Sequence, residues 1–348
     1  MAKIYSKPDN LFPILNSESD ACSLTGLARI AAEAPLDSTG FLTEYRPLRS
    51  RSIVSKVNSR RGIPFSHAIN PYRGCEFGCR YCYARYTHEF LEMSPAEFEQ
   101  KIYFKEHAAW LLEQELRRME RGTQIAIGTA TDPYQPLERK LGVTRSLLEV
   151  FARHSGFKLG IVTKSTLVAR DAGLLKEIAK KNRLTVHLTV TTMNVKLARV
   201  LEPRAPRPDL RMATLRQLRD AGLRAGVLCS PLMPGITDSA GSIRAVARAA
   251  AEARACFFAA GALFLKPCSL PTFLGFVREH FPDHLAAYEQ RYATSAFVSA
   301  AYRKRVAELV EAACRECKLG KRYTFEAAAD GSAAEGDAVE LQPWLPFA

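Results

Sequence analysis

Three cysteines close together in the chain are the side chains best suited to unusual chemistry. Cys75, Cys79 and Cys82 follow a Cys-x3-Cys-x2-Cys spacing. A loop this short can turn three sulfur atoms toward one point, and Gly74 and Gly78 allow the backbone conformations that such a loop needs. Thiolates favour zinc ions and iron–sulfur clusters. The spacing therefore predicts a metal site.

The number of nearby ligands bears on which metal centre this is. A structural zinc site usually closes with four ligands, but the next cysteine along the chain is Cys229. A four-iron cluster held by three cysteines keeps one iron open for a small-molecule ligand. The alternatives are a fragment of a zinc knuckle or three ordinary buried cysteines.

The residues around the cysteines carry a family resemblance. The motif, with the aromatic Tyr81 before its last cysteine, resembles the radical S-adenosylmethionine (radical SAM) superfamily. The longer run Asn-Pro-Tyr-Arg-Gly-Cys…Cys-Tyr-Ala-Arg resembles the branch related to spore photoproduct lyase. This resemblance implies a [4Fe-4S] cluster on the three cysteines and S-adenosylmethionine (SAM) on its open iron. It also implies an electron donor such as a flavodoxin or ferredoxin, and a 5′-deoxyadenosyl radical that abstracts hydrogen from the substrate.

A series of β-then-α units must position these residues. Short apolar runs alternate with amphipathic stretches from residue 66 onward, which is typical of a parallel sheet covered by helices. We expect strands at 66–70, 124–131, 157–163, 184–191, 223–229 and 257–265, and a largely helical stretch at 96–120. Eight units would close a barrel. Six agree with the partial (β/α)6 barrel that the resemblance implies.

We expect four parts along the chain. Residues 1–65 form an N-terminal arm, partly irregular and basic near 46–61; residues 66–280 form the barrel core. Residues 281–326 form a C-terminal helical extension, and 327–348, rich in Ala, Gly, Asp and Glu, a disordered tail. The basic stretch either binds nucleic acid or is a solvated extension that pairs with the barrel edge, and we favour the extension.

The ends of the predicted strands supply the other candidate residues, because active residues of parallel β/α folds gather there. The second strand leads into Gly-Thr-Ala-Thr-Asp-Pro-Tyr-Gln-Pro, which resembles the same branch, so Thr129, Thr131 and Asp132 are candidates for the SAM amino group. A helix cap is the alternative for Asp132. Lys164 and Ser165 follow the third strand, and Lys164 could neutralise the SAM carboxylate or a substrate phosphate.

The later strands give further candidates. Thr189 and Thr191 lie on one face of the fourth strand and suit the ribose, as the resemblance implies, although threonine is also a good strand former. Met233 and Pro234 follow the fifth strand and are implied to hold adenine through the backbone, with the Tyr81 ring packing on it. Cys268, after the sixth strand, is a candidate hydrogen donor or a buried thiol. The Cys314 and Cys317 pair is expected to consist of ordinary helix residues.

Charge and composition suggest the partner and the compartment. The formal net charge is +13, which favours DNA or RNA as a partner, although a generally basic proteome would give the same balance. Many arginines lie on helices such as 210–221, where a solvated face is expected. Sparse cysteines suit a reducing compartment, and no secretory signal or membrane span is evident. We expect a soluble cytoplasmic protein.

The sequence thus predicts a radical SAM enzyme whose substrate is nucleic acid, with repair or modification of the photoproduct-lyase type. A first alternative is the same chemistry on a protein, a peptide or a small metabolite. A second is a non-catalytic metal-binding protein that binds nucleic acid. The polar residues after strands two and three count against this last alternative, because a structural metal knuckle does not need them.

Overall fold

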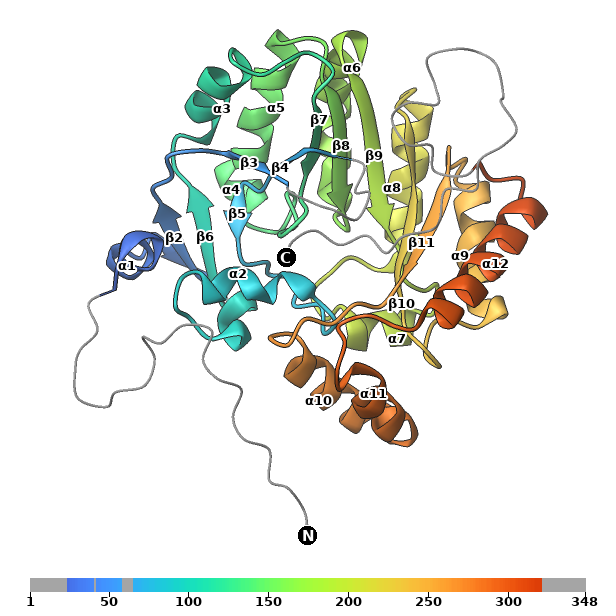
Figure 1. Cartoon of the computed structure of the whole chain (residues 1–348). Coiled ribbons are helices and arrows are strands. Elements are labelled where there is room, and N and C mark those ends of the chain that lie inside the picture. Colours follow the sequence, from blue (N-terminus) through green and yellow to red (C-terminus); the bar gives the residue numbers. More distant parts are fainter. Residues whose placement is uncertain (1–23, 41, 58–64, 321–348) are drawn as a thin grey trace, which may run out of the picture.

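The fold is built around one twisted parallel sheet (Figure 1). The computed structural model describes residues 24–40, 42–57 and 65–320. In these residues the main sheet has seven strands in the order β11-β10-β9-β8-β7-β4-β3. The parallel strands are β4 (His67–Ile69), β7 (Gln124–Ile127), β8 (Lys158–Thr163), β9 (Arg183–Thr189), β10 (Ala225–Leu232) and β11 (Phe258–Ala262). The predicted partial (β/α)6 barrel is confirmed.

Helices cover the outer side of this sheet. Buried strand residues such as Ile161, Val186 and Val227 form one core with helix residues such as Leu148 and Leu215. Burying each such side chain contributes about 1.5–3 kcal/mol. The helices are α3 (Ala108–Leu116), α5 (Val143–Arg153), α6 (Ala172–Lys181), α8 (Pro208–Asp220), α9 (Ala240–Glu252) and α12 (Ala300–Glu316).

The arm contributes strands at one edge. β3 (Val54–Lys56), within the basic stretch, pairs antiparallel with β4. A second sheet has the order β1-β2-β6-β5, from β1 (Ser38–Thr39), β2 (Glu44–Leu48), β6 (Lys101–Lys105) and β5 (Tyr72–Arg73). The helix α1 (Gly26–Glu33) packs Ala31 against this sheet beside Leu48 and Tyr103.

The prediction of a helix over 96–120 is wrong in its first part. The 3-10 turn η2 (Pro95–Glu99) is followed by strand β6, and α3 begins only at Ala108. Ile102 and Phe104 point to one side of β6, where they pack with Tyr45 and Tyr72, while Tyr103 faces α1. This alternation and the aromatic side chains favour a strand, and pairing with β2 satisfies its backbone.

The remaining elements include several that pack near the cysteine loop. They are η1 (Tyr83–Arg85), α2 (Tyr86–Glu89), α4 (Glu138–Leu141), η3 (Thr166–Asp171), α7 (Val195–Leu201), α10 (Leu270–His280), η4 (Pro282–His284) and α11 (Leu285–Tyr292). Cys75 and Tyr81 share a hydrophobic cluster with Phe273 and Tyr288 of α10 and α11. No helix among the described residues is long and apolar enough to cross a membrane. The predicted disordered tail at 327–348 lies outside the described residues.

Candidate active site

The cysteine loop begins after β5, and two glycines shape it. Gly74 has φ +80°, and a Cβ there would lie 2.8 Å from the carbonyl oxygens of Phe98 and Lys101. Gly78 has φ +61°, and a Cβ there would lie 3.2 Å from Nη2 of Arg204. Glycine adopts these angles without a steric penalty, so the loop conformation requires both residues, as the sequence predicts.

The three thiols of the loop are buried or partly buried, and none is in a disulfide. Burial raises the pKa of all three, to about 12 for Cys79, and for Cys75 the negative charges of Asp132, Cys79 and Cys82 raise it further. Cys75 and Cys79 belong to one packed cluster and Cys82 packs against it, so the three thiols lie near one another. A bound metal cation would lower the pKa of these thiols, because thiols that coordinate a metal are deprotonated. The donor set therefore fits an iron–sulfur cluster.

Among the residues that the structure describes, no three Cys, His, Asp or Glu side chains converge closely enough to hold a single metal ion. A lone zinc ion needs every sulfur at about 2.3 Å. In a four-iron cluster each cysteine binds a different iron, so the sulfur atoms need not meet at one point.

A second set of residues fixes the loop from outside. The Glu76 carboxylate accepts hydrogen bonds from the Tyr45 hydroxyl at 2.8 Å and from the Leu137 backbone N–H at 2.9 Å. The Gln135 amide oxygen accepts from the Glu76 backbone N–H at 3.0 Å. Tyr45 belongs to β2, so a strand of the N-terminal arm directly supports the loop. Sequence reasoning missed this support, because nothing in the spacing links residue 45 to residue 76.

The three candidates after β7 have structural hydrogen bonds. Thr131 donates to the Gly74 carbonyl at 2.7 Å, and the Thr129 hydroxyl accepts from the Asn70 side chain at 3.2 Å. Asp132 accepts from the Thr163 hydroxyl at 2.6 Å and from the Lys164 backbone N–H at 2.7 Å. These hydrogen bonds connect the segments that follow β4, β7 and β8, and they hold these segments together on one side of the site.

Lys164 lies at the exit of β8 with its ammonium available to a ligand. In the described part of the chain its Nζ makes no hydrogen bond or ion pair, and it lies 5.6 Å from the centre of the Tyr81 ring. Burial alone would lower its pKa, but the negative charges of Cys79 and Glu202 outweigh this and raise it. Lys164 therefore stays charged. Ser165 next to it caps η3 by accepting from the Leu167 N–H at 3.2 Å.

A buried ion pair lies beside the loop. Arg211 of α8 donates to Glu202 at 2.5 Å and to the Thr189 carbonyl at 3.0 Å. Glu202 also accepts from the hydroxyls of Tyr81 and Thr191. Burial alone would raise the pKa of Glu202, but Arg211, Lys164 and Tyr81 hold it below the usual value. Glu202 thus joins Tyr81, Thr189 and Thr191 in one network.

The expectation that the arginines of 210–221 are solvated is wrong for Arg211, which is 1% exposed. Arg211 shares a helix face with Leu215 and Leu218, both fully buried, because residues three and four apart on a helix are neighbours. This spacing of Arg211 from apolar residues was the sequence signal that could have predicted its burial. Its acidic partner could not be identified from spacing alone.

The loop after β10 is held by the C-terminal helices. Met233 is fully buried, and the carbonyl of Pro234 accepts from the Tyr288 hydroxyl at 2.7 Å. Asp238 accepts from the Gly235 N–H and from the Tyr302 hydroxyl, both at 2.8 Å. The loop that carries Met233 and Pro234 is therefore held in place by Tyr288 and Tyr302, and its contact with adenine stays a prediction.

Cys268 lies next to the cysteine loop in space. Its sulfur is 3.6 Å from the Ser269 hydroxyl, which donates to the Cys82 carbonyl at 2.8 Å. The side chain is partly buried, and its role as a hydrogen donor stays a prediction. Cys314 instead lies on α12 and belongs to the main core, while Cys317 directly follows the last residue of α12 and packs against that core.

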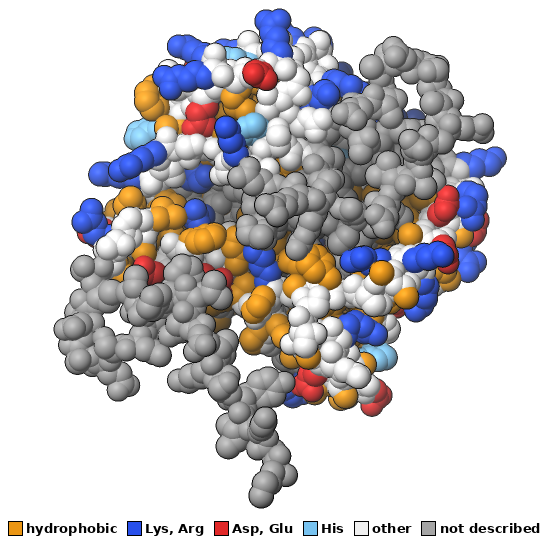
Figure 2. Space-filling view, viewed as in Figure 1, with side chains coloured by type: hydrophobic (Ala, Val, Ile, Leu, Met, Phe, Trp, Pro, Cys, Tyr) orange, Lys and Arg blue, Asp and Glu red, His pale blue; other side chains and the backbone are white. Residues whose placement is uncertain are grey.

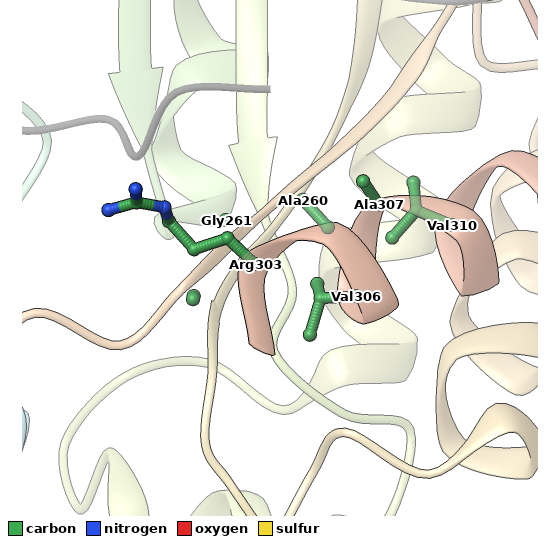
Figure 3. Close-up of a pocket in the computed structure, with 7 residues that line it drawn as sticks. Ala260, Gly261, Arg303, Val306, Ala307 and Val310 are labelled. Atoms are coloured by element: carbon green, nitrogen blue, oxygen red, sulfur yellow. The ribbon is translucent and has the colours of Figure 1, made fainter. Parts of the chain in front are cut away.

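A small crevice between β11 and α12 contains none of these residues. Figure 3 shows that it is lined by small apolar side chains and that the Arg303 side chain extends away from it. Its volume of about 10 Å³ would hold at most one water molecule. The lining residues are Ala260, Gly261, Ala262, Arg303, Val306, Ala307 and Val310. We regard it as a packing defect.

Comparison with known proteins gives the family. The family profile described as "Radical SAM superfamily" matches residues 69–244. A protein of Mycobacterium bovis is 32% identical over 295 residues, which cover 84% of this chain and 86% of the relative. A protein of Methanocaldococcus jannaschii is 28% identical over 197 residues, covering 55% and 72%. The chain therefore belongs to the radical SAM superfamily.

Solved structures agree on the fold. Spore photoproduct lyase complexed with dinucleoside spore photoproduct matches with a TM-score of 0.56 and 14% identity, covering 81% of this chain and 82% of that chain. A mutant of the same lyase matches with a TM-score of 0.57. Radical SAM proteins are enzymes that use a [4Fe-4S] cluster and SAM, so this chain is a radical SAM enzyme. The alternative of a non-catalytic metal-binding protein is wrong.

Proposed function

We propose that this enzyme holds its [4Fe-4S] cluster through Cys75, Cys79 and Cys82 and modifies or repairs nucleic acid. The observation that supports the cluster assignment is that three thiols pack into one cluster on a loop whose conformation requires Gly74 and Gly78. When bound, the reduced cluster supplies the electron that cleaves SAM to a 5′-deoxyadenosyl radical, which abstracts hydrogen from the substrate.

The chain's own residues would then bind and orient SAM. The Lys164 ammonium suits the SAM carboxylate, because among the described residues its Nζ forms no hydrogen bond or ion pair and its partly buried charge attracts an incoming anion. Thr129, Thr131, Asp132 and Ser165 would fix the backbone around the methionine part. Thr189 and Thr191 would lie along the ribose. The fixed Met233–Pro234 segment and the Tyr81 ring would enclose the adenine.

Cys268 would return hydrogen to the substrate. Its S–H bond breaks, the hydrogen atom bonds to the substrate carbon radical, and the sulfur is left as a thiyl radical. One electron from a flavodoxin or ferredoxin and one proton from water restore the thiol. The placement of Cys268 beside Cys82 supports this role, because a donor must lie near the carbon where the radical forms.

DNA or RNA is the substrate class that we propose. The net charge of +13 favours a polyanion, and the lyase of the same fold has a solved structure in complex with dinucleoside spore photoproduct. A reducing cytoplasm would suit the free thiols of the site and the electron donor. The alternative is the same chemistry on a protein, a peptide or a small metabolite.

Anaerobic reconstitution tests the cofactor assignment. We expect a brown protein containing iron, and 5′-deoxyadenosine formed from SAM and dithionite. Cys79→Ala should abolish this product, whereas Cys229→Ala, at a buried cysteine outside the loop, should not. A protein that binds zinc and no iron would contradict the assignment.

The substrate class is tested separately. Ultraviolet-irradiated DNA should increase 5′-deoxyadenosine formation above the rate with unirradiated DNA, and Cys268→Ala should reduce the yield of repaired or modified DNA. If no nucleic acid stimulates the reaction while a peptide or metabolite does, the alternative substrate class is correct.

A further inference from the structure

A fully buried arginine lies behind the cysteine loop. On the face shown in Figure 2, Lys and Arg side chains are spread over the surface, where water solvates them. Arg85 is instead 0% exposed. It belongs to the turn η1 and follows Cys82 by three residues. Removing a guanidinium group from water is costly, so the contacts of Arg85 inside the protein decide what its charge does.

The guanidinium group of Arg85 bonds both the cysteine loop and the turn η2. Its Nη2 donates to the Cys79 carbonyl at 3.4 Å. Its Nη1 donates to the Pro95 carbonyl at 3.1 Å and to the Glu99 carboxylate at 2.5 Å. Because different nitrogens bond the loop and the carboxylate, the positive charge lies between Glu99 and the cysteine loop.

The turn η2 also contacts the start of the cysteine loop. The Cys75 backbone N–H donates to the Phe98 carbonyl at 3.1 Å, and Cζ of Arg85 lies 5.8 Å from the centre of the Phe98 ring. One turn therefore holds Cys75 directly and Cys79 through Arg85. The guanidinium group is thus fixed in position relative to two of the three proposed cluster ligands.

Holding these segments together does not by itself require a charge. Apolar residues of similar volume often replace a buried ion pair without loss of stability. The guanidinium group is 1% exposed but the Glu99 side chain is 15% exposed, and water screens an exposed charge more strongly than a buried one. Burial raises the pKa of Cys82, the charge of Arg85 lowers it, and the charge of Glu99 raises it by a smaller amount. The positive charge therefore dominates at the loop.

Two other cations act on Cys79, and they differ from Arg85 in their partners. The Lys164 ammonium forms no hydrogen bond or ion pair within the described residues and is the proposed ligand of the SAM carboxylate. Arg211 is bonded to the fully buried Glu202 at 2.5 Å. Arg85 bonds only protein groups and is closed off from solvent. Its charge can therefore act on the cluster without binding SAM or substrate.

We propose that Arg85 is a positioning residue that raises the reduction potential of the [4Fe-4S] cluster, and that Glu99 opposes it. This inference rests on the proposed cluster assignment. One electron from the flavodoxin or ferredoxin lowers the charge of the cluster by one, and no atom is transferred. A buried cation nearby stabilises the more negative, reduced state. Net charge and solvent exposure are among the properties that set the potential of iron–sulfur clusters.

An anaerobic redox titration of the reconstituted protein without SAM tests this role. In Arg85→Gln, the ratio of reduced to oxidised cluster at a fixed potential should fall about tenfold, a shift of about 59 mV for one electron. Glu99→Gln should raise the same ratio, because the opposing charge is lost. Arg85→Lys keeps the charge and should stay near the wild type. Lys180→Gln, which breaks an exposed pair with Glu177 at 2.8 Å, is the control and should not change the potential.

The opposite signs separate an effect of charge from a distorted loop. Arg85→Gln and Glu99→Gln break the same ion pair, so a purely structural role would shift the potential in one direction in both. The variants are compared at equal iron and sulfide content. If Arg85→Gln does not retain a cluster, Arg85→Gln/Glu99→Gln leaves no unpaired charge and should have a lower potential than Glu99→Gln alone. If this double variant also loses the cluster, the expected rise in Glu99→Gln decides.

The outcomes also separate this inference from the proposed function. Unchanged potentials in Arg85→Gln and Glu99→Gln, or shifts in the same direction, would overturn the role of Arg85 alone. The same conclusion would follow if Arg85→Lys had the potential of Arg85→Gln. A wild type that binds no iron would refute the proposed cluster site and this inference with it.

Discussion

At the scale of single residues, a buried ion pair lies beside the cysteine loop. Glu202 and Arg211 are fully buried and bonded to each other, to Tyr81 and to the Thr189 carbonyl. A buried ion pair is weak proof of stability, but removing one partner leaves the other charge unpaired. The loss of stability should therefore be largest when only one of the two residues is replaced.

Arg211→Leu is expected to destabilise the protein by about 3–5 kcal/mol, because Glu202 then keeps only the hydroxyls of Tyr81 and Thr191 and the charge of Lys164. Urea unfolding under anaerobic conditions measures this. Arg207→Leu, which breaks an exposed pair with Asp209 at 2.7 Å, is the matched control and should change little. Equal losses in the two variants would contradict the importance of the buried pair.

His88 should make stability depend on pH. It is fully buried, and its Nε2 lies 3.0 Å from the Lys101 carbonyl. Its Nδ1 is buried and has no hydrogen-bond partner among the residues that the structure describes. Burial lowers its pKa from 6.5 to about 4. A depressed pKa means that the unfolded chain takes up a proton first, so stability is fully present above pH 6.5 and falls toward pH 4, by about 3 kcal/mol in total.

His88→Gln should remove this part of the pH dependence, because glutamine does not titrate and can still donate to the Lys101 carbonyl. Urea unfolding at pH 7 and pH 5 gives the difference. His107→Gln, at an exposed histidine, should keep the wild-type slope. The assignment fails if His88→Gln loses as much stability on acidification as the wild type does.

At the scale of elements, the C-terminal helices fix the loop after β10. Tyr288 of α11 donates to the Pro234 carbonyl, and Tyr302 of α12 donates to Asp238. These helices follow the last parallel strand, so their role in the site is not evident from the order of β/α units.

Tyr288→Phe/Tyr302→Phe is expected to raise the KM for SAM several-fold and to change kcat less, because the proposed adenine surface loses two anchors. Each lost hydrogen bond should also cost about 1 kcal/mol of stability. Tyr292→Phe is the control, since its hydroxyl donates to the Leu263 carbonyl at 3.0 Å and not to this loop. The same KM in all three proteins would show that the anchors do not position SAM.

At the scale of the whole molecule, two sheets meet at the cysteine loop. The main sheet supplies the loops after β4, β7 and β8, and the small sheet supplies Tyr45, which donates to Glu76 next to Cys75. The N-terminal arm thus closes one side of the cluster site.

Tyr45→Phe is expected to speed the loss of iron from the reconstituted protein several-fold in the presence of a chelator, because Glu76 loses a donor that fixes the loop. Tyr103→Phe, in the same small sheet with its hydroxyl near Met93 and the Ala31 carbonyl, should lose iron at the wild-type rate. Equal rates for Tyr45→Phe and the wild type would mean that the arm does not help to retain the cluster.

Local sequence patterns were enough to predict much of the fold but only part of the candidate site. Apolar runs such as Leu159–Ile161 and Val186–Leu188 predicted the strands because burial requires them to be apolar. β6 was missed because its five residues lie between two stretches of helical composition. Arg211 was assigned to a solvated face because charge outweighed its place on the apolar stripe of α8. Residues paired across long separations, such as Tyr45 and Glu76, leave no local pattern.

The sequence by itself determined the three-cysteine loop, the six β/α units and the family resemblance, because each depends on residue types at short spacing. Only the tertiary structure decided which polar residues support the loop and which remain available to a ligand. Thr131 and Asp132 are bonded to the backbone, whereas Lys164 keeps a free ammonium. It also brought Tyr45 beside Glu76 and Ser269 beside Cys82, although each pair is far apart in the chain. Such convergence depends on the path of the chain between them, which short-range spacing does not record.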